Sequence, residues 1–534
     1  MNSPNGRSLR RRRLLRTGTA ASLSLCTTTA AAFPPRVFAP TSERMRPQIP
    51  FGVQTGDITD DGALVWAATD RPARMIVDYA TTESFADSRR LVGPSALDVS
   101  DYTARTAITG IAPGQTVFYR VTFLDLGDYR TLSAPATGSF RVPPASTDRD
   151  VSFVWTGDTA GQGFGINRDW GGMRLYAAMH RCAPDFLVHC GDQIYADNPI
   201  PAAITLDDGT VWRNLVTEEK AKVAETLREY RGNYRYNLMD ENVRRLNAEV
   251  PTITLWDDHE VRDNWFHAQR IRDDDRYREK SVGLLAARGV RAFLDYNPIR
   301  LDPDEPERIY RRFAYGPHLD LFRTDMRSYR GDNGPNRETA RSAATDYLGL
   351  AQLAWLKRTL QVSTATWKVI AADMPLGLVS WDDGPGPRAE TPANGDHGPP
   401  LGRELEIADL LSFIRRERIH NVLWITADVH YCATHYYDPA QAAFGDFLPF
   451  YEFISGPANA GGFGALDLDG TFGPRVMFQR VPPASRQNVA PSQGMAFFGH
   501  VKIDGQSGVM TVTHRDADGV ILHTSELAPA PGKV

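Results

Sequence analysis

The chain has 534 residues, of which 42% are hydrophobic and 23% are charged, and its formal net charge is −5. This length exceeds one ordinary domain and allows a large buried core. The negative net charge argues against a nucleic-acid-binding surface. No internal run of about 18 apolar residues predicts a transmembrane helix. The composition therefore indicates a globular protein of several domains, with no integral membrane segment and no evident nucleic-acid partner.

The N-terminus has the pattern of an export signal. Four consecutive arginines, Arg10 to Arg13, precede an uncharged and weakly apolar stretch, Thr17 to Ala32. A basic start, a short apolar middle and small residues at the end are typical of secretory signals. The arginine cluster resembles a twin-arginine signal, which implies the twin-arginine export machinery as a partner. We therefore expect a signal and linker over residues 1–39 and a periplasmic, cell-surface or extracellular protein. A disordered basic tail is the alternative.

The segment from 46 to 145 has the pattern of a β-sandwich. Short runs rich in β-branched and aromatic residues stand at 62–67, 74–79 and 117–123, with Gly, Asp and Pro turns between them. Regular spacing of this kind predicts an N-terminal β-sandwich domain. Because similar modules also serve in adhesion, a carbohydrate-binding or surface-binding protein is an alternative function.

From residue 150 to about 530, apolar strands alternate with helical segments near 174–181, 350–360 and 403–418. This alternation indicates a layered α/β fold, in which ligands bind at the carboxyl ends of strands. A single strand-end aspartate is commonly a cap or turn residue. Here five apolar runs all end in aspartate, which indicates that they converge on one acidic site. The runs are 151–158, 185–192, 250–258, 367–373 and 421–428.

Long inserts separate these strands. One spans 199–247 and a second spans 263–311. The second insert carries many charges between Arg270 and Lys280, which predicts a solvated helical insertion. The segment 384–400 is rich in Gly and Pro and predicts a loop near the mouth of the site.

A ring of buried aspartates repels itself and stays ionised only when cations neutralise it. Carboxylates together with a tyrosine and a histidine are mostly hard oxygen donors, which suit Fe(III), Mn²⁺, Ca²⁺ or Mg²⁺ better than thiolate-bound zinc. A non-catalytic, calcium-stabilised protein is a second alternative. His259 and Tyr195 argue against it, because a calcium site needs neither residue.

Four motifs occur in the order of the calcineurin-like metallophosphoesterase signature. They are Gly157-Asp158, Gly191-Asp192-Gln-Ile-Tyr195, Trp256-Asp-Asp-His-Glu260 and Ala427-Asp-Val-His430. Together with Asp325-Met-Arg-Ser-Tyr-Arg330 and the export signal before a β-sandwich, they resemble the PhoD-type alkaline phosphatase/phosphodiesterase branch of that superfamily. The resemblance implies a metallophosphoesterase fold with central β-sheets flanked by helices.

The resemblance also implies a set of metal ligands. Asp158 would bind the first metal and Asp192 would bridge two metals. Tyr195 would add a phenolate and His430 an imidazole to the first metal, as in the purple acid phosphatases, which the chain resembles in this respect. A phenolate ligand implies Fe(III). Asp258 would bind the second metal.

Some positions depart from the family pattern. Many relatives have Cys at the position of Asp158, and other metallophosphoesterases have His at the position of Asp428. With Asp158 the first metal loses a soft ligand. Asp258, where many relatives have Asn, and Asp428, also a predicted metal ligand, make the second site more anionic and favour Ca²⁺, so the expected cofactors are Fe(III) and Ca²⁺, with Mn²⁺, Mg²⁺ or Zn²⁺ as alternatives. Asp373 and Asp257 are weaker ligand candidates, and Asp257 equally fits a turn position.

The implied reaction is hydrolysis of a phosphate ester by hydroxide formed at the metals. His259 would donate a hydrogen bond or a proton to the leaving oxygen. Arg327 would grip non-bridging phosphate oxygens, or alternatively form an ion pair with Asp325. Tyr195 could instead be a packing residue, and Glu260 fits a supporting partner of the ligands better than a ligand. Monoesters, diesters and phospholipids, the last by a phospholipase D-like activity, are all open as substrates.

Overall fold

The computed structural model describes residues 43–382 and 386–530. Arg44–Val534 forms one compact unit. The export signal expected at residues 1–39 lies outside the described residues. Within the described ranges, every helix is too short or too polar to cross a bilayer.

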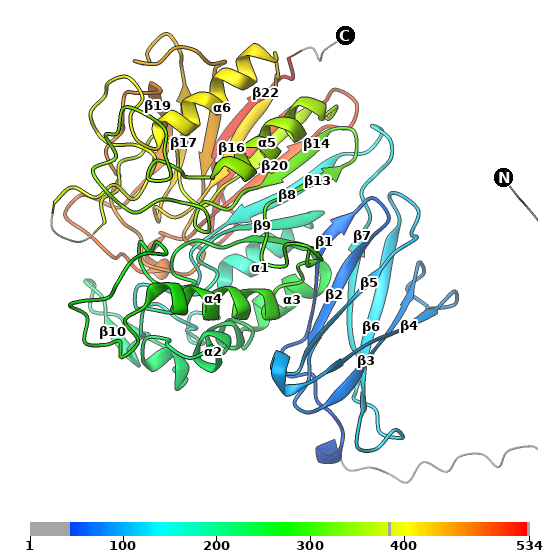
Figure 1. Cartoon of the computed structure of the whole chain (residues 1–534). Helices are drawn as coiled ribbons and strands as arrows, with labels where there is room; N and C mark the ends of the chain where they lie inside the picture. The colour runs from blue at the N-terminus through cyan, green and yellow to red at the C-terminus, as the bar shows by residue number, and fades with distance from the viewer. Residues whose placement is uncertain (1–42, 383–385, 531–534) are drawn as a thin grey trace, which may run out of the picture. The chain divides into compact units, whose positions relative to one another are not determined.

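A nine-stranded sheet forms one central layer of the molecule (Figure 1). Its centre is a parallel trio in which Val188 of β9 registers with Trp155 of β8 and with Ile253 of β12. These strands are buried along almost their whole length, because they are covered on both faces. In spatial order the sheet contains β22 (Ile521–Leu527), β21 (Met510–Asp516), β20 (Phe497–Ile503), β8 (Val151–Thr156), β9 (Phe186–Cys190), β12 (Thr252–Leu255), β1 (Val53–Thr59), β2 (Gly62–Ala68) and β5 (Thr103–Ile108).

A seven-stranded sheet packs face to face against the first. Four of its strands, β14, β15, β16 and β18, run parallel to one another. Fully buried side chains from both sheets, including Trp155, Val188, Val369 and Ile425, form a shared core between them. The spatial order is β13 (Arg311–Tyr315), β14 (Leu319–Arg323), β15 (Trp367–Ala371), β16 (Val422–Thr426), β18 (Phe450–Ile454), β17 (Cys432–Tyr437) and β19 (Pro474–Arg480).

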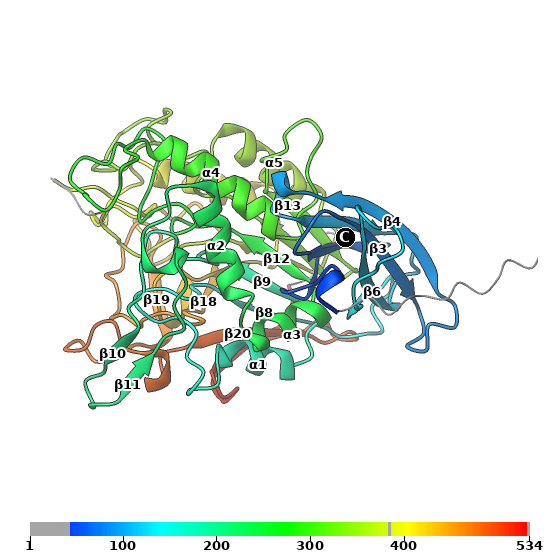
Figure 2. The ribbon, with the colours of Figure 1, turned by 90° about the horizontal axis from the view of Figure 1, so that it is seen from below.

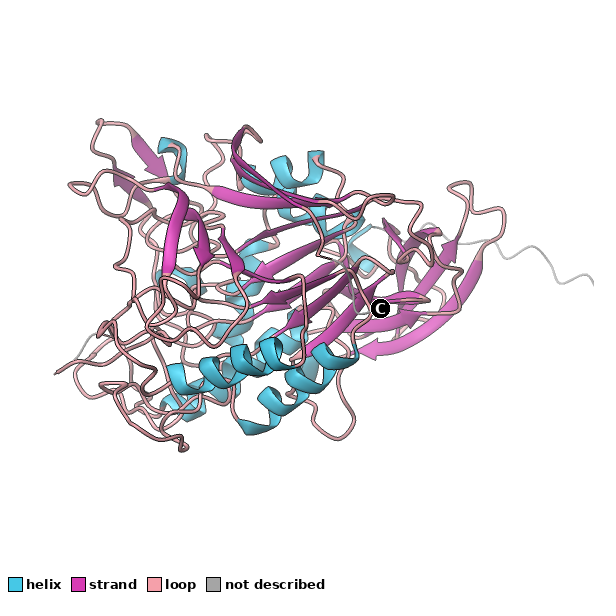
Figure 3. Cartoon of the chain, turned by 90° about the horizontal axis from the view of Figure 1, so that it is seen from above, coloured by secondary structure: helices cyan, strands magenta, loops and turns pink. Residues whose placement is uncertain are grey.

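Helices cover the outer faces of both sheets (Figure 3). The nine-stranded sheet packs against α1 (Arg174–Arg181), α2 (Leu227–Asn237), α3 (Glu241–Glu249) and α4 (Val282–Tyr296). The seven-stranded sheet packs against α5 (Leu350–Val362) and α6 (Glu404–Arg416). The predicted layered α/β fold is therefore confirmed, with two sheets between two helical layers. Single 3₁₀ turns stand at η1 (Glu43–Met45), η2 (Asp98–Ser100), η3 (Glu219–Ala221) and η4 (Pro491–Gln493).

The expected N-terminal β domain is present at one end of these layers (Figure 2). Its second layer contains β4 (Arg89–Ala96), β3 (Ala73–Ala80), β6 (Thr116–Asp125) and β7 (Ala136–Arg141). Its first layer, β1, β2 and β5, belongs to the nine-stranded sheet, because Gly56 of β1 pairs with Thr252 of β12. A Cβ at position 56 would lie 2.6 Å from the Thr252 carbonyl oxygen, so the junction requires glycine. This pairing covers a sheet edge that would otherwise be exposed.

The second insert, 263–311, contains a helix as predicted, but its charged segment 270–280 is not helical. The backbone N–H of Ile271 donates to the Lys280 carbonyl, and the Asp274 carboxylate accepts from the Arg276 backbone N–H. Such local side-chain bonds compete with helix formation. The helix of this insert is α4, which begins only at Val282.

The insert 199–247 and the Gly/Pro-rich segment differ in how much helix and strand they contain. The insert 199–247 contains the hairpin of β10 (Ala203–Thr205) and β11 (Val211–Arg213), followed by α2 and most of α3. A capping box formed by Thr226 and Glu229 starts α2. In contrast, the described part of the Gly/Pro-rich segment, 386–400, has neither helix nor strand, as predicted.

Candidate functional site

The structure brings the strand-end aspartates of the two sheets together. In the nine-stranded sheet they directly follow β8, β9 and β12, and in the seven-stranded sheet they follow β15 and β16. Parallel strands present their carboxyl ends at the same edge, which explains the convergence. All of these carboxylates are at most 3% exposed except that of Asp428, which is half-buried. The set consists of Asp158, Asp192, Asp257, Asp258, Asp373 and Asp428.

Four residues at this edge adopt left-handed backbone conformations. The φ angles are 64° at Asp158, 51° at Asp192, 67° at Asp428 and 60° at His430. Few residues other than glycine adopt positive φ, and aspartate tolerates it better than most. Such angles turn the chain sharply after each strand and direct the side chain toward the shared edge. Strain of this kind accumulates at functional sites.

Two groups of side chains have the arrangement of a metal-binding site. One comprises Asp158, Asp192 and His430, and the other comprises Asp192, Asp258 and His259. Within each group, one ligand atom from each residue lies within 4.8 Å of the others. The two groups share Asp192, so its carboxylate can contact two ions. Adjacent ions sharing one carboxylate are typical of two-metal hydrolytic sites.

The carboxylates of these groups fit bound cations. Both oxygens of Asp158 and Oδ1 of Asp258 are buried without a hydrogen-bond partner. Burial, followed by repulsion from Asp257, raises the pKa of Asp158 well above its usual value, and burial has the same effect on the pKa of Asp192. Buried carboxylate oxygens without donors are costly unless a positive charge compensates them. An oxygen-rich donor set with one or two imidazoles suits hard cations.

Tyr195 lies inside the same cluster. Its hydroxyl is 2.6 Å from Nε2 of His430, and its ring stacks on His259 with centroids 4.2 Å apart. The side chain is 1% exposed. Burial, followed by the charge of Asp192, raises the pKa of this phenol well above its usual value. The phenol therefore needs a strong Lewis acid nearby if it is to act as a phenolate.

His259 is oriented by a residue that the sequence analysis did not identify. Its Nδ1 lies 2.7 Å from Oδ1 of Asp197, and Nε2 lies 3.7 Å from Oδ1 of Asp263. Burial lowers the pKa of His259, but Asp197, Asp258 and Asp192 outweigh burial and raise it well above its usual value. Both missed aspartates stand a few residues beyond a motif, Asp197 after Tyr195 and Asp263 after Glu260. Position alone is a weak signal, because polar residues are common in loops.

Glu260 holds the two motif loops together. Its carboxylate accepts hydrogen bonds from the backbone N–H groups of Asp192, Gln193 and Asp257, at 3.2, 2.6 and 2.8 Å. The carboxylate is buried, and burial raises its pKa to about 8. This geometry agrees with the supporting role expected for Glu260.

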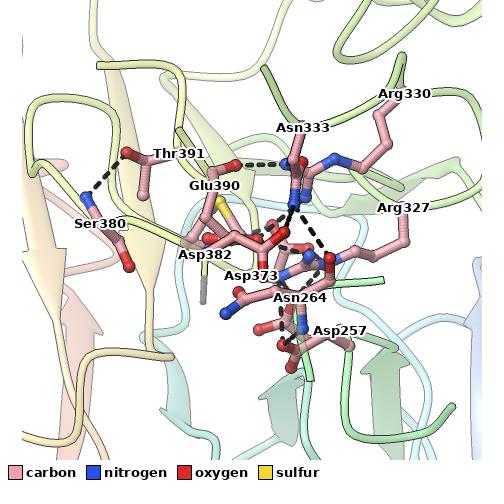
Figure 4. A network of polar contacts seen from close by, with 12 residues as sticks. Asp257, Asn264, Arg327, Arg330, Asn333, Asp373, Ser380, Asp382, Glu390 and Thr391 are labelled. Carbon is pink, nitrogen blue, oxygen red and sulfur yellow. Dashed lines mark hydrogen bonds and ion pairs between the residues drawn. The ribbon is translucent and has the colours of Figure 1, made fainter. Parts of the chain in front are cut away.

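Arg327 was expected to grip phosphate oxygens, but its guanidinium contacts carboxylates of the protein instead. Its guanidinium is fully buried and contacts Asp257 Oδ1 at 2.5 Å and Glu390 Oε1 at 2.5 Å, with Asp373 Oδ2 at 3.7 Å (Figure 4). The alternative ion pair with Asp325 is also not formed, because the Asp325 carboxylate accepts instead from the backbone N–H of Arg327. A guanidinium surrounded by carboxylates is not free to grip a phosphate. The geometry favours a positioning role.

The Arg327 contacts belong to a larger polar network (Figure 4). Glu390, from the Gly/Pro-rich segment, also accepts from Arg330 at 3.0 Å. Arg330 donates to the side chain of Asn333, whose amide donates in turn to the backbone carbonyl of Asn264 at 2.9 Å. The backbone N–H of Asn264 donates to Oδ2 of Asp258 at 2.6 Å. The network thus connects the segment that carries Glu390 to a candidate metal ligand.

The predicted ligands therefore divide into three sets. Asp158, Asp192, Asp258 and His430 lie in the metal-binding groups, and Tyr195 contacts His430. Asp257 and Asp373 face Arg327. Asp428 lies outside both groups found among the described residues. His259, expected beside the substrate, belongs to the second group.

Comparisons with known proteins show the family and agree with this fold. The sequence model of the PhoD-like phosphatase family matches residues 153–514, and that of the PhoD-like phosphatase N-terminal domain matches residues 34–144. Alkaline phosphatase D of Bacillus subtilis (strain 168) is 26% identical over 403 residues, which cover 71% of this chain and 64% of that protein. The match thus spans less than two thirds of the length of this relative.

Solved structures show the same fold. A structure of PhoD superposes with a TM-score of 0.66 at 19% identity, covering 90% of this chain and 89% of that chain. The purple acid phosphatase PPD1 from yellow lupin (Lupinus luteus) seeds superposes with a TM-score of 0.53 at 12% identity, covering 90% and 74%. The family model covers more than half of the sequence and includes every candidate ligand. The chain therefore belongs to the PhoD-like phosphatase family.

Proposed function

We propose that this chain is an exported, metal-dependent phosphoesterase that hydrolyses phosphate monoesters, phosphate diesters or both. The observation that carries the proposal is the pair of ligand groups that share Asp192, the second of which includes His259. Family membership supports the same reaction class. The proposal assigns residues 46–145 to the N-terminal β domain and residues 150–530 to the catalytic domain.

The proposed first site consists of Asp158, Asp192, Tyr195 and His430, and the second is built on Asp192 and Asp258. Fe(III) suits the first site because Tyr195 offers a phenol beside His430. Ca²⁺ suits the second site because its carboxylates are hard donors. Bound cations there would polarise phosphoryl oxygens and lower the pKa of water enough to provide hydroxide near neutral pH.

Side chains of the protein itself orient the site and can donate a proton to the leaving group. His259 is anchored through Nδ1 by Asp197, which leaves Nε2 as the ring nitrogen that can donate to a leaving oxygen. Arg327 holds Asp257 and Glu390, and so supports the backbone beside Asp258 without touching the substrate. In this proposal Arg327 is therefore a positioning residue.

The proposal of export rests on the sequence of the N-terminus. The arginine cluster at residues 10–13 and the uncharged stretch that follows support passage through the twin-arginine machinery. This pathway exports proteins that are already folded, which suits a protein that must acquire its metals before export. Fusion of residues 1–39 to a reporter, with the arginines replaced by lysine in a control, tests this part.

The function is tested by metal analysis together with kinetics. We expect purified protein to contain iron and calcium and to hydrolyse p-nitrophenyl phosphate, bis-p-nitrophenyl phosphate or both, with activity lost to a chelator. Tyr195→Phe should abolish a visible phenolate-to-iron absorption band. Hydrolysis that survives complete metal removal would contradict the proposal, whereas a colourless and active protein would overturn only the iron assignment.

A further inference from the structure

A cleft with a volume of about 780 Å³ opens directly beside the candidate centre. Its inner end is formed by Asp197 and Asp263, the two carboxylates that flank the imidazole of His259. Its walls come from the insert residues 262–276 and from the Gly/Pro-rich segment through Arg388. A space of this size holds a ligand much larger than one phosphate group. The cleft is therefore large enough to hold the leaving group of a substrate.

Arginines dominate the cationic side chains of this cleft. Arg276 is paired with Asp274 at 2.7 Å, and Arg388 is paired with Asp382 at 2.9 Å. The remaining three lining arginines are only weakly compensated. They are Arg262, Arg270 and Arg272.

The weakly compensated arginines can accept an anion. Arg262 approaches Asp274 only to 4.0 Å, and its buried Nε has no hydrogen-bond partner in the described part of the chain. Across residues 43–382 and 386–530, no ion pair involves Arg270 or Arg272, and both side chains are exposed. Guanidinium groups bind phosphate through paired, charge-assisted hydrogen bonds.

The carboxylates of the cleft do not cancel this charge. Asp197 accepts from His259 and from the backbone N–H of Asp263, and Asp274 and Asp382 are paired with arginines. Among the lining carboxylates of the described chain, Asp273 forms no ion pair, and Asp263 is paired only with His259, at 3.7 Å. The inner end is thus acidic and flanks His259, and the outer wall presents weakly compensated guanidinium groups.

We propose that the cleft binds a leaving group that carries a second phosphate. The inference rests on the proposed phosphoesterase function and specifies its substrate class. The scissile phosphate lies at the acidic centre, and the distal phosphate lies against Arg262, Arg270 and Arg272. A substrate with a neutral leaving group gains nothing from this outer wall.

The test uses two substrates with the same ester and different distal groups. One is 1,6-hexanediol bisphosphate, whose two esters are equivalent, and the other is 6-hydroxyhexyl phosphate. The variant is Arg270→Ser/Arg272→Ser, in which only exposed side chains outside the proposed catalytic machinery change. The control is Arg89→Ser/Arg358→Ser, which removes two exposed arginines from β4 and α5 with the same change in net charge.

We expect kcat/KM of the unaltered protein to favour the bisphosphate by about tenfold, since charge-assisted hydrogen bonds to phosphate are strong. The Arg270→Ser/Arg272→Ser variant should lose this preference and keep its kcat/KM for p-nitrophenyl phosphate, and the control should keep both. Raised salt should weaken the preference. Hydrolysis of p-nitrophenyl phosphate without any preference, or with one that survives in the variant, overturns the inference. Failure to hydrolyse any of these monoesters overturns the inference, and failure to hydrolyse bis-p-nitrophenyl phosphate as well refutes the phosphoesterase function itself.

Discussion

The acidic centre has two halves. Both contain aspartates that follow strands, but the halves differ in how the negative charge of these carboxylates is compensated. Asp158, Asp192 and Asp258 form the open half, whose oxygens include several without donors. Asp257 and Asp373, with Glu390, form the guanidinium half, because they surround Arg327. Every one of these carboxylates is almost completely buried.

The difference shows two solutions to one electrostatic problem. Buried carboxylates cannot remain charged together without positive charge nearby. The guanidinium half contains that charge within the protein, as a fixed side chain. The open half has only His259 and a distant contact from Arg327, 3.9 Å from Asp258, among the described residues, and is suited to cations from solution. Under the proposed function, the strand-end aspartates that bind metal are those that Arg327 does not already neutralise.

Loss of the shared ligand, Asp192, should have the largest effect. Asp192→Asn should reduce kcat/KM for p-nitrophenyl phosphate by roughly 10³-fold or more, because metal ions stabilise transition-state charge by several kcal/mol. Metal content should fall as well. Asp373→Asn, in the guanidinium half, is the matched control and should retain both metals in elemental analysis. Equal metal loss in the two variants would contradict the division into halves.

Removal of the central guanidinium should cost stability. Arg327→Met leaves Asp257 and Asp373 buried beside each other without their positive partner, and breaking a buried ion pair costs about 3–5 kcal/mol. The free energy of unfolding in denaturant measures this loss. The double variant Arg327→Met/Asp257→Asn removes charge of both signs and should recover part of it. A destabilisation below about 1 kcal/mol would show that the ion pairs do not hold this half together.

A buried ionisable group can also remain uncharged, and the pH dependence of stability then shows its effect. Burial lowers the pKa of His514 to about 3, and its ring nitrogens lie 2.9 Å from Thr434 Oγ1 and 2.7 Å from Ser455 Oγ. The unfolded chain binds this proton near pH 6.5, so stability is present above that pH and falls as pH decreases toward 3. At pH 5 the loss is about 2 kcal/mol. His514→Gln should flatten the decline in unfolding free energy between pH 7.5 and 5, and an unchanged decline would exclude this histidine.

The smallest effect should come from the outer edge of the guanidinium half. Glu390→Gln keeps the shape of the side chain but weakens its hold on Arg327 and Arg330, and groups that orient metal ligands change activity by about 10-fold or more. We expect kcat to fall about tenfold while KM changes little, since Glu390 does not contact the substrate. Glu338→Gln, on a nearby loop, is a control that should leave both constants unchanged. A KM effect without a kcat effect would place Glu390 in substrate binding instead.

The sequence by itself determined the strands, the layered fold and the residues of the centre. Apolar runs that end in aspartate form buried parallel strands, and the carboxyl ends of such strands share one edge. This local pattern was enough to bring together Asp158, Asp192 and Asp258. The resemblance of the motifs to a known family predicted that Tyr195 and His430 lie with them.

Only the tertiary structure decided which charge meets which partner. Arg327, Asp257 and Glu390 are separated by more than 60 positions along the chain, and the course of the connecting loops sets their contacts. The pairing of Asp197 with His259 and the continuation of the central sheet into β1 likewise depend on distant segments meeting. The non-helical course of 270–280 depends on a backbone bond between Ile271 and Lys280 together with local side-chain bonds. Local periodicity encodes the burial of a residue, whereas compensation of a buried charge depends on groups that only folding brings within a few ångströms.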